Sequence, residues 1–253
     1  MKRTLAAVLI VLAAFGVASA QAGRSAADKG VKAIAPDDAV ELLLARNLLA
    51  QGGVATFGIK TRITRGRVQM SESPNPGTFE SYEKAPDKKM EVLNAPTGQF
   101  IDAADGTRRW EKSPWGLAVT LGGADDSRDG GAPGARAYRW RKYFSSAKIR
   151  GRAVLDGREV VVLDATPRGD RPVVMYFDAE TWLLSRQDFS PPATRQENEF
   201  KSVVIDRYDV VDGVKIPTVF RQVFTKYTLT FRIYEVKHNV PIDDALFRDP
   251  NGK

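Results

Sequence analysis

The chain has 253 residues, a formal net charge of +7 at pH 7, one histidine and no cysteine. The lack of cysteine excludes a disulfide framework, thiol catalysis, thiolate metal sites and lipidation at a cysteine. The basic residues are spread along the chain and form no single run, so the charge does not indicate nucleic-acid binding, although it would favour anionic lipid head groups.

The first segment, residues 1–20, has the pattern of a secretory signal peptide. Lys2 and Arg3 form a positive start, residues 5–17 are an apolar run, and Ala-Ser-Ala at 18–20 is a small-residue cleavage site. The apolar run is shorter than the roughly 20 residues that a membrane-spanning helix needs. We therefore expect cleavage after Ala20, a periplasmic location and no integral membrane segment.

Residues 21–35, rich in Ala, Gly and Lys, indicate a flexible linker. A helix is predicted over residues 36–51, because proline suits its first turn, two aspartates follow the proline, and Gly52-Gly53 ends it. The spacing i, i+3, i+4 and i+8 gives this helix one apolar face, formed by Val40, Leu43, Leu44 and Leu48. Such a face must pack on other elements.

Short extended segments follow, separated by turns rich in Pro, Gly, Asp and Asn. The segments of the first half are residues 59–70, 78–84, 88–94, 99–103 and 107–112. Asp105-Gly106 between two of them indicates a hairpin, since a type I′ turn needs positive φ at both central residues. The segment GGADDSRDGGAPGA at 122–135 predicts a mobile loop, and a short amphipathic helix is expected over 135–144.

The second half repeats this pattern, with Asp156-Gly157 and Asp212-Gly213 at two of its turns. Its extended segments are residues 147–155, 158–166, 172–178, 182–189, 200–211, 214–223 and 227–237. Alternation, which is clearest along the last segment, predicts that one face of the sheet is buried and the other is wet. About a dozen sequential strands with two helices predict a mainly β (α+β) domain over 36–253. We expect one large curved antiparallel sheet whose helices cover the concave face, as a half-barrel in preference to a closed barrel.

Seven stretches resemble the LolA/LolB-like periplasmic lipoprotein-carrier fold, and especially exported bacterial proteins of the outer-membrane lipoprotein-sorting type. They are ELLLARNLLAQGG at 41–53, RITRGRV at 62–68, GTFESYEKAPDKKMEVL at 77–93, DGTRRWEKSP at 105–114, MYFDAETWLLSRQD at 175–188, DRYDVVDGVKIPTVFRQ at 206–222 and EVKHNVPIDDALFRDP at 235–250. The resemblance covers most of the chain after the leader and implies a half-barrel that carries lipid-modified cargo.

Two positions depart from the pattern of that family. The family's carrier has an arginine before the proline that ends a strand, where it helps to control cargo release, and this chain has Ala85 there. At the turn that usually reads Asp-x-x-Thr-Gly-Leu, Trp182 stands in place of the glycine. The first departure weakens the implication of lipoprotein shuttling, and the second implies an altered hairpin.

The sequence predicts no catalytic residue, no metal and no cofactor. His238 is the only histidine, so it cannot form a histidine-based metal site, and no G-x-S-x-G motif accompanies it. We expect it to be a strand-end histidine with a satisfied hydrogen bond. The acidic pairs at 37–38, 125–126 and 243–244 are explained by helix capping and turns.

Alternation assigns six apolar residues to the concave face as ligand-binding candidates: Val173, Met175, Phe177, Leu229, Phe231 and Ile233. Arg62, Arg65 and Arg67 are expected to form either a basic rim for a head group or a solvated strand face. The sequence thus favours a non-catalytic protein that binds a lipid or a lipoprotein acyl chain. The alternative is an envelope interaction or sensor protein that binds a protein partner, and an unrecognised hydrolase comes third.

Overall fold

The computed structural model describes residues 36–120, 140–168, 171–192 and 197–249. The expected signal peptide, linker and loop at 122–135 lie outside these residues, as does the first half of the helix expected at 135–144; its residues 140–143 are helical, and Phe144 begins a strand. The helical elements are α1 (Pro36–Gln51), η1 (Gly53–Gly58), α2 (Trp140–Tyr143) and η4 (Asp244–Phe247). The strands are β1 (Thr61–Met70), β2 (Gly77–Lys84), β3 (Lys88–Ala95), β4 (Gly98–Asp105), β5 (Arg109–Ser113), β6 (Gly116–Thr120), β7 (Phe144–Leu155), β8 (Arg158–Pro167), β9 (Val173–Asp178), β10 (Leu184–Phe189), β11 (Phe200–Val211), β12 (Val214–Phe224) and β13 (Thr228–His238).

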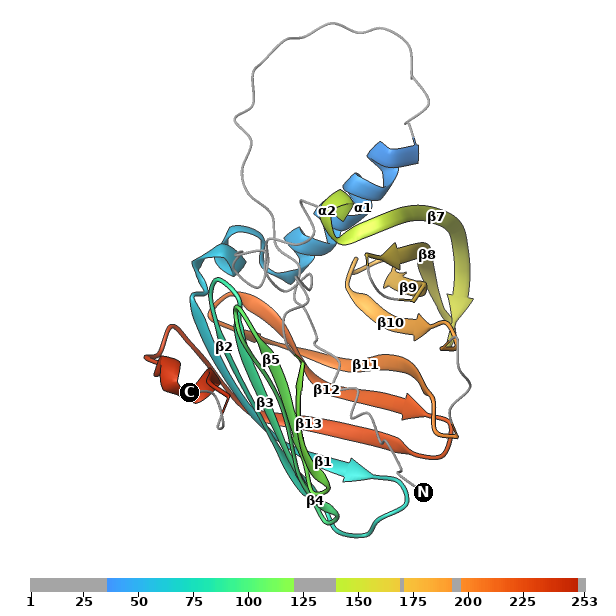
Figure 1. The fold of residues 1–253 in the computed structure, drawn as a ribbon. Coiled ribbons are helices and arrows are strands. Elements are labelled where there is room, and N and C mark those ends of the chain that lie inside the picture. Colours follow the sequence, from blue (N-terminus) through green and yellow to red (C-terminus); the bar gives the residue numbers. More distant parts are fainter. Residues whose placement is uncertain (1–35, 121–139, 169–170, 193–196, 250–253) are drawn as a thin grey trace, which may run out of the picture.

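These strands form one antiparallel sheet of 13 strands, in the order β6-β5-β4-β3-β2-β1-β13-β12-β11-β10-β9-β8-β7. Every pair of neighbours is also adjacent in sequence except β1 and β13, which join the two halves of the chain. The sheet curls strongly but stays open, with β6 and β7 as its edges (Figure 1). The predicted half-barrel is therefore confirmed, and the closed barrel is wrong.

Helix α1 begins and ends at the predicted residues and lies across the concave side of the sheet (Figure 1). Its buried residues Val40, Leu43 and Leu44 belong to the same apolar cluster as the inner side chains of the strands. The main sheet contacts of α1 are with β7 and β12. The concave side is called the inner face below, and the opposite side the outer face.

Part of the outer face is also buried in the first half of the sheet, which corrects the prediction that the whole of that face is wet. Met90, Val92 and Trp110 on the outer face pack against Ile242 and Phe247 from the chain's C-terminal segment. The Trp110 Nε1–H donates a hydrogen bond of 3.0 Å to the Phe247 carbonyl oxygen. The C-terminal segment passes the end of β2, where Lys84 bonds to the Ile242 carbonyl oxygen, and its η4 lies against β3 and β4 (Figure 1). The sequence signals for single strands do not reveal a segment that returns from so far along the chain.

The three Asp-Gly pairs do not all form the expected turn. Asp156-Gly157 and Asp212-Gly213 have positive φ at both residues, as type I′ hairpins require. Only the glycine of Asp105-Gly106 has positive φ. There the Asp105 carboxylate accepts hydrogen bonds from the backbone N–H groups of Thr107 and Arg108, at 2.8 Å each, and so stabilises a longer loop.

Trp182 joins α1 to the turn between β9 and β10. Its φ of 61° lies in the left-handed region that favours glycine, which accounts for the glycine expected at this position. The Asn47 Nδ2–H donates a hydrogen bond of 2.7 Å to the Trp182 carbonyl oxygen, and the Arg46 guanidinium lies 4.4 Å from the centre of the Trp182 ring. Trp182 thus combines a left-handed backbone conformation with two contacts from α1.

We expect Asn47→Ala to lower the free energy of unfolding by about 1–3 kcal/mol, because it removes the partner of the partly buried Trp182 carbonyl and of the buried Gln51 amide. Leu49→Ala, at an exposed position of the same helix, is the matched control and should change stability by less than about 0.5 kcal/mol. Denaturant unfolding of both variants measures the difference. Equal effects would contradict the role given to Asn47.

Candidate functional site

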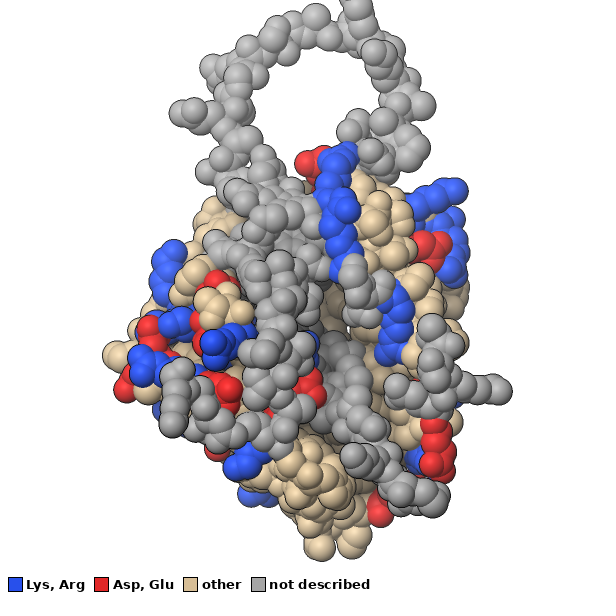
Figure 2. Space-filling view, in the orientation of Figure 1, with Lys and Arg blue, Asp and Glu red and all other residues tan. Residues whose placement is uncertain are grey.

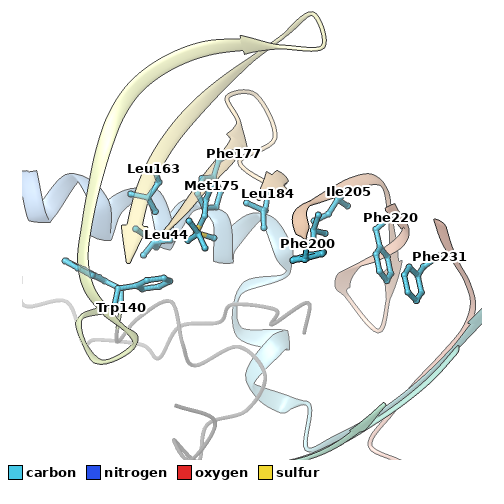
Figure 3. Packing of buried hydrophobic residues seen from close by; sticks show 14 of the residues in the cluster. Leu44, Trp140, Leu163, Met175, Phe177, Leu184, Phe200, Ile205, Phe220 and Phe231 are labelled. Atoms are coloured by element: carbon cyan, nitrogen blue, oxygen red, sulfur yellow. The ribbon is translucent and has the colours of Figure 1, made fainter. Parts of the chain in front are cut away.

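An apolar layer of side chains covers the inner face in both halves of the sheet. Figure 3 shows part of it, from Leu163 and Met175 beside Leu44 of α1 to Phe220 and Phe231. The Phe231 ring stacks on Phe220, with centroids 4.6 Å apart, and meets Phe79 edge-on at 5.2 Å. The layer is continued across β13, β1, β2, β3 and β4 by register partners that we call the apolar row: Ile233, Gly66, Phe79, Leu93 and Phe100.

The structure brings all six sequence-predicted ligand residues to this layer. Five of them are buried members of the inner cluster, and Leu229 is partly buried and packs against it. Val173, Met175 and Phe177 share this cluster with the apolar face of α1. Leu229 and Phe231 lie opposite Met70 and Val68, their register partners on β1. The six therefore form two groups, one near α1 and one at the junction of the two halves.

Towards one end of the first five strands, the inner face changes from apolar to polar. Two residues along β2, Phe79 is followed by Ser81, and at the same level of β3 Leu93 gives way to Glu91. We call the register partners at this level the polar row: Thr64, Ser81, Glu91, Asp102 and Glu111. This row was not predicted from the sequence, although the spacing Phe-x-Ser-x-Glu at 79–83 is a period-2 signal for it.

The buried charges around the polar row are largely paired. Arg62 donates two hydrogen bonds, of 2.7 and 2.6 Å, to the Glu83 carboxylate. Arg109 donates two, of 2.9 and 2.8 Å, to Asp102. The paired geometry offsets part of the desolvation of these ions.

Glu91 is the exception in the polar row. Its Oε1 lies 2.5 Å from the Lys89 Nζ, whereas its Oε2 is buried without a hydrogen-bond partner. The hydroxyl of Ser81, its register partner on β2, also lacks one. Burial raises the pKa of the Glu91 carboxyl above its usual value, and the Lys89 ammonium opposes part of that rise.

The three arginines of β1 do not form one basic rim, because alternation separates them. Arg62 is buried on the inner face in its ion pair with Glu83. Arg65 lies on the outer face, where it pairs with Glu80 and Glu235, and Arg67 is exposed on that face. Figure 2 shows Lys and Arg intermingled with Asp and Glu over the visible side of the molecule. A head-group rim formed by these arginines is therefore wrong.

His238 lies on the inner face next to Arg62, its register partner. The imidazole is 2 % exposed, and its Nδ1 lies 3.0 Å from an Asp212 carboxylate oxygen. Burial lowers the pKa of the imidazole, the charge of Arg62 lowers it further, and the bond to Asp212 opposes the change. The folded protein therefore favours the neutral imidazole.

This lowered pKa predicts a loss of stability in mild acid. Below the usual imidazole pKa of 6.5 the unfolded chain binds a proton that folded His238 resists, so the free energy of unfolding falls as the pH drops from about 7 towards 5. In His238→Gln this contribution should vanish. The free energy of unfolding is measured against pH for the wild type and for His238→Gln. The difference between the two curves separates the effect of His238 from that of Glu91, whose raised pKa acts with the opposite sign. Parallel curves would contradict the prediction.

Within the described residues, no group of three or more His, Cys, Asp or Glu side chains is arranged to hold a metal ion. Nor is any helix of those residues long and apolar enough to cross a membrane.

No protein-family model and no curated protein matches the chain. Among solved structures, a DUF1329 family protein from Desulfovibrio piger has 15% identity and a TM-score of 0.57, over 84% of this chain and 97% of that one. A LolA superfamily protein from Nitrosomonas europaea has 12% identity and a TM-score of 0.55, over 83% and 97%. A domain from Vibrio parahaemolyticus, named after outer membrane lipoprotein-sorting proteins, has 11% identity and a TM-score of 0.54, over 82% of this chain and 97% of that one. The chain therefore has a LolA-like fold, which confirms the sequence resemblance.

Proposed function

We propose that this protein is a non-catalytic binding protein that holds a lipid, or the acyl chains of a lipoprotein, against the inner face of its half-barrel. The observation that carries the proposal is the apolar layer, which continues through both halves of the sheet and packs against the apolar face of α1 in the second half. Binding sites for apolar ligands are concave and mostly apolar. The name of the Vibrio parahaemolyticus domain, which has the same fold, supports acyl cargo.

Burial of the chain's methylene groups supplies the free energy of binding, at ~0.8 kcal/mol each. Helix α1 has its main sheet contacts with β7 and β12. The inner residues of β1 to β4 therefore lie outside the part of the sheet that α1 packs against. An acyl chain that enters there contacts Leu229, Phe231 and Ile233 first. It reaches Val173, Met175 and Phe177 only when α1 moves away from the cluster it shares with them.

The proposed place of action is the periplasm, after removal of residues 1–20. The positive start, apolar run and Ala-Ser-Ala site support this processing. N-terminal sequencing of the exported protein should begin at Gln21, and a sequence beginning at Met1 would contradict the prediction.

The test is the binding of a fluorescent fatty-acyl probe to the delipidated mature protein at micromolar concentration. We expect saturable binding that an unlabelled fatty alcohol of the same chain length displaces. A protein that binds no probe would overturn the proposal. The inner layer would then be a closed core, and the protein-partner alternative would take its place.

A further inference from the structure

The inner face of β2, β3 and β4 is divided into two parallel strips. The apolar row contributes Phe79 and Leu93, and the polar row contributes Ser81 and Glu91, two residues further along the same strands. Two residues of a strand span about 6.6 Å. One amphiphile can therefore lay its tail on the apolar row and place its head group on the polar row.

Two buried groups of the polar row lack hydrogen-bond partners, and they face each other across one strand pair. Ser81 is 4 % exposed and Glu91 is 5 % exposed, and the Ser81 Oγ and the Glu91 Oε2 form no hydrogen bond. A buried polar group without a partner costs free energy and is uncommon in native structures. Both groups accept hydrogen bonds, so a ligand that donates them would satisfy both at once.

The charges of the surroundings select the sign of that ligand. Asp102 forms an ion pair with Arg109, and Arg62 forms an ion pair with Glu83. The inner face of β1 to β5 carries three cations and four anions at the level of the polar row and the next level. The cations are Arg62, Lys89 and Arg109, and the anions are Glu83, Glu91, Asp102 and Glu111. By formal charge, an anionic head group would meet one more anion than cation here, although the whole chain carries a net positive charge.

We propose that the ligand is an amphiphile with a positively charged amine head group, which donates hydrogen bonds to Glu91 and Ser81 while its tail lies on the apolar row. This inference rests on the proposed function, because it places the tail on the face proposed to bind acyl chains. Charge-assisted hydrogen bonds are stronger than neutral ones. An amine should therefore bind more tightly than an alcohol of the same length, and a carboxylate more weakly.

The test compares dodecylamine, dodecanol and dodecanoate as competitors of the fluorescent acyl probe on the full mature protein. We expect dodecylamine to compete about tenfold or more better than dodecanol. Equal competition by the three would overturn the head-group site and leave the proposed function standing. Failure of the probe itself to bind would overturn both.

Three variants locate the site. Glu91→Gln should abolish the preference for the amine and keep the binding of dodecanol. Ser81→Ala should weaken the preference several-fold without loss of stability, because it removes an unpartnered buried hydroxyl; this variant keeps the test sharp if Glu91→Gln folds poorly. Glu80→Gln removes the same charge from the outer face of β2 and should keep the full preference. A preference lost in Glu80→Gln, or kept in both other variants, would overturn the proposal.

Discussion

Replacing Phe231 with alanine should lower the free energy of unfolding by about 3–5 kcal/mol and weaken binding of the acyl probe at least tenfold. Phe231 is 1 % exposed and lies between the rings of Phe220 and Phe79, at the junction of the two halves of the sheet. Its loss leaves a cavity and removes apolar surface from the proposed ligand path. Denaturant unfolding measures the first effect, and probe titration under conditions where the variant is folded measures the second.

Arg232→Ala is the matched control, one residue away on the opposite face. Its side chain is exposed, so the substitution should change stability by less than about 0.5 kcal/mol and leave binding unchanged. Phe231→Asp should abolish binding, because it would place a charge in an apolar layer. Similar effects of Phe231→Ala and Arg232→Ala would show that the inner face of β13 has no special role.

Arg62→Ala should lower the free energy of unfolding by about 3–5 kcal/mol, because it removes a buried guanidinium that donates two hydrogen bonds to the Glu83 carboxylate. The side chain of Arg62 is 6 % exposed and that of Glu83 is 17 % exposed, so the ion pair is largely shielded from solvent. Thermal or denaturant unfolding measures the loss.

Arg67→Ala, on the outer face of the same strand, is the control and should be close to neutral. The double variant Arg62→Met/Glu83→Leu should recover part of the loss, since an apolar pair of similar size replaces the ion pair. An Arg62→Ala variant as stable as Arg67→Ala would contradict the assignment of Arg62 to the buried inner face.

The elements set by local periodicity were predictable from sequence. The apolar spacing of Val40, Leu43 and Leu44 and the glycines after Gln51 define α1 to the residue. Alternation places Phe231 inside and Arg232 outside, because a period of two is a local property of a strand. The open sheet follows from sequential strands joined by short turns, together with a family resemblance.

The features set by distant partners were not predictable. A charged residue on a strand is normally expected to face solvent. The burial of Arg62 and Glu91 instead depends on the residues that face them across neighbouring strands, which the local sequence does not show. The outer cluster depends on Phe247 returning to Trp110, 137 residues away along the chain. The contacts of Asn47 and Arg46 with Trp182 likewise join residues about 135 positions apart along the chain. Local patterns therefore identify the apolar half of the inner face and miss its polar half.

Native mass spectrometry of the protein isolated from the periplasm of its own host tests the central claim most directly. We predict a species heavier than the mature chain, whose added mass disappears after organic extraction and is recovered in the extract as an acyl lipid. The bare mass of the mature chain, with no lipid in the extract and no uptake of acyl probe, would contradict the claim that the inner face of this half-barrel binds acyl chains.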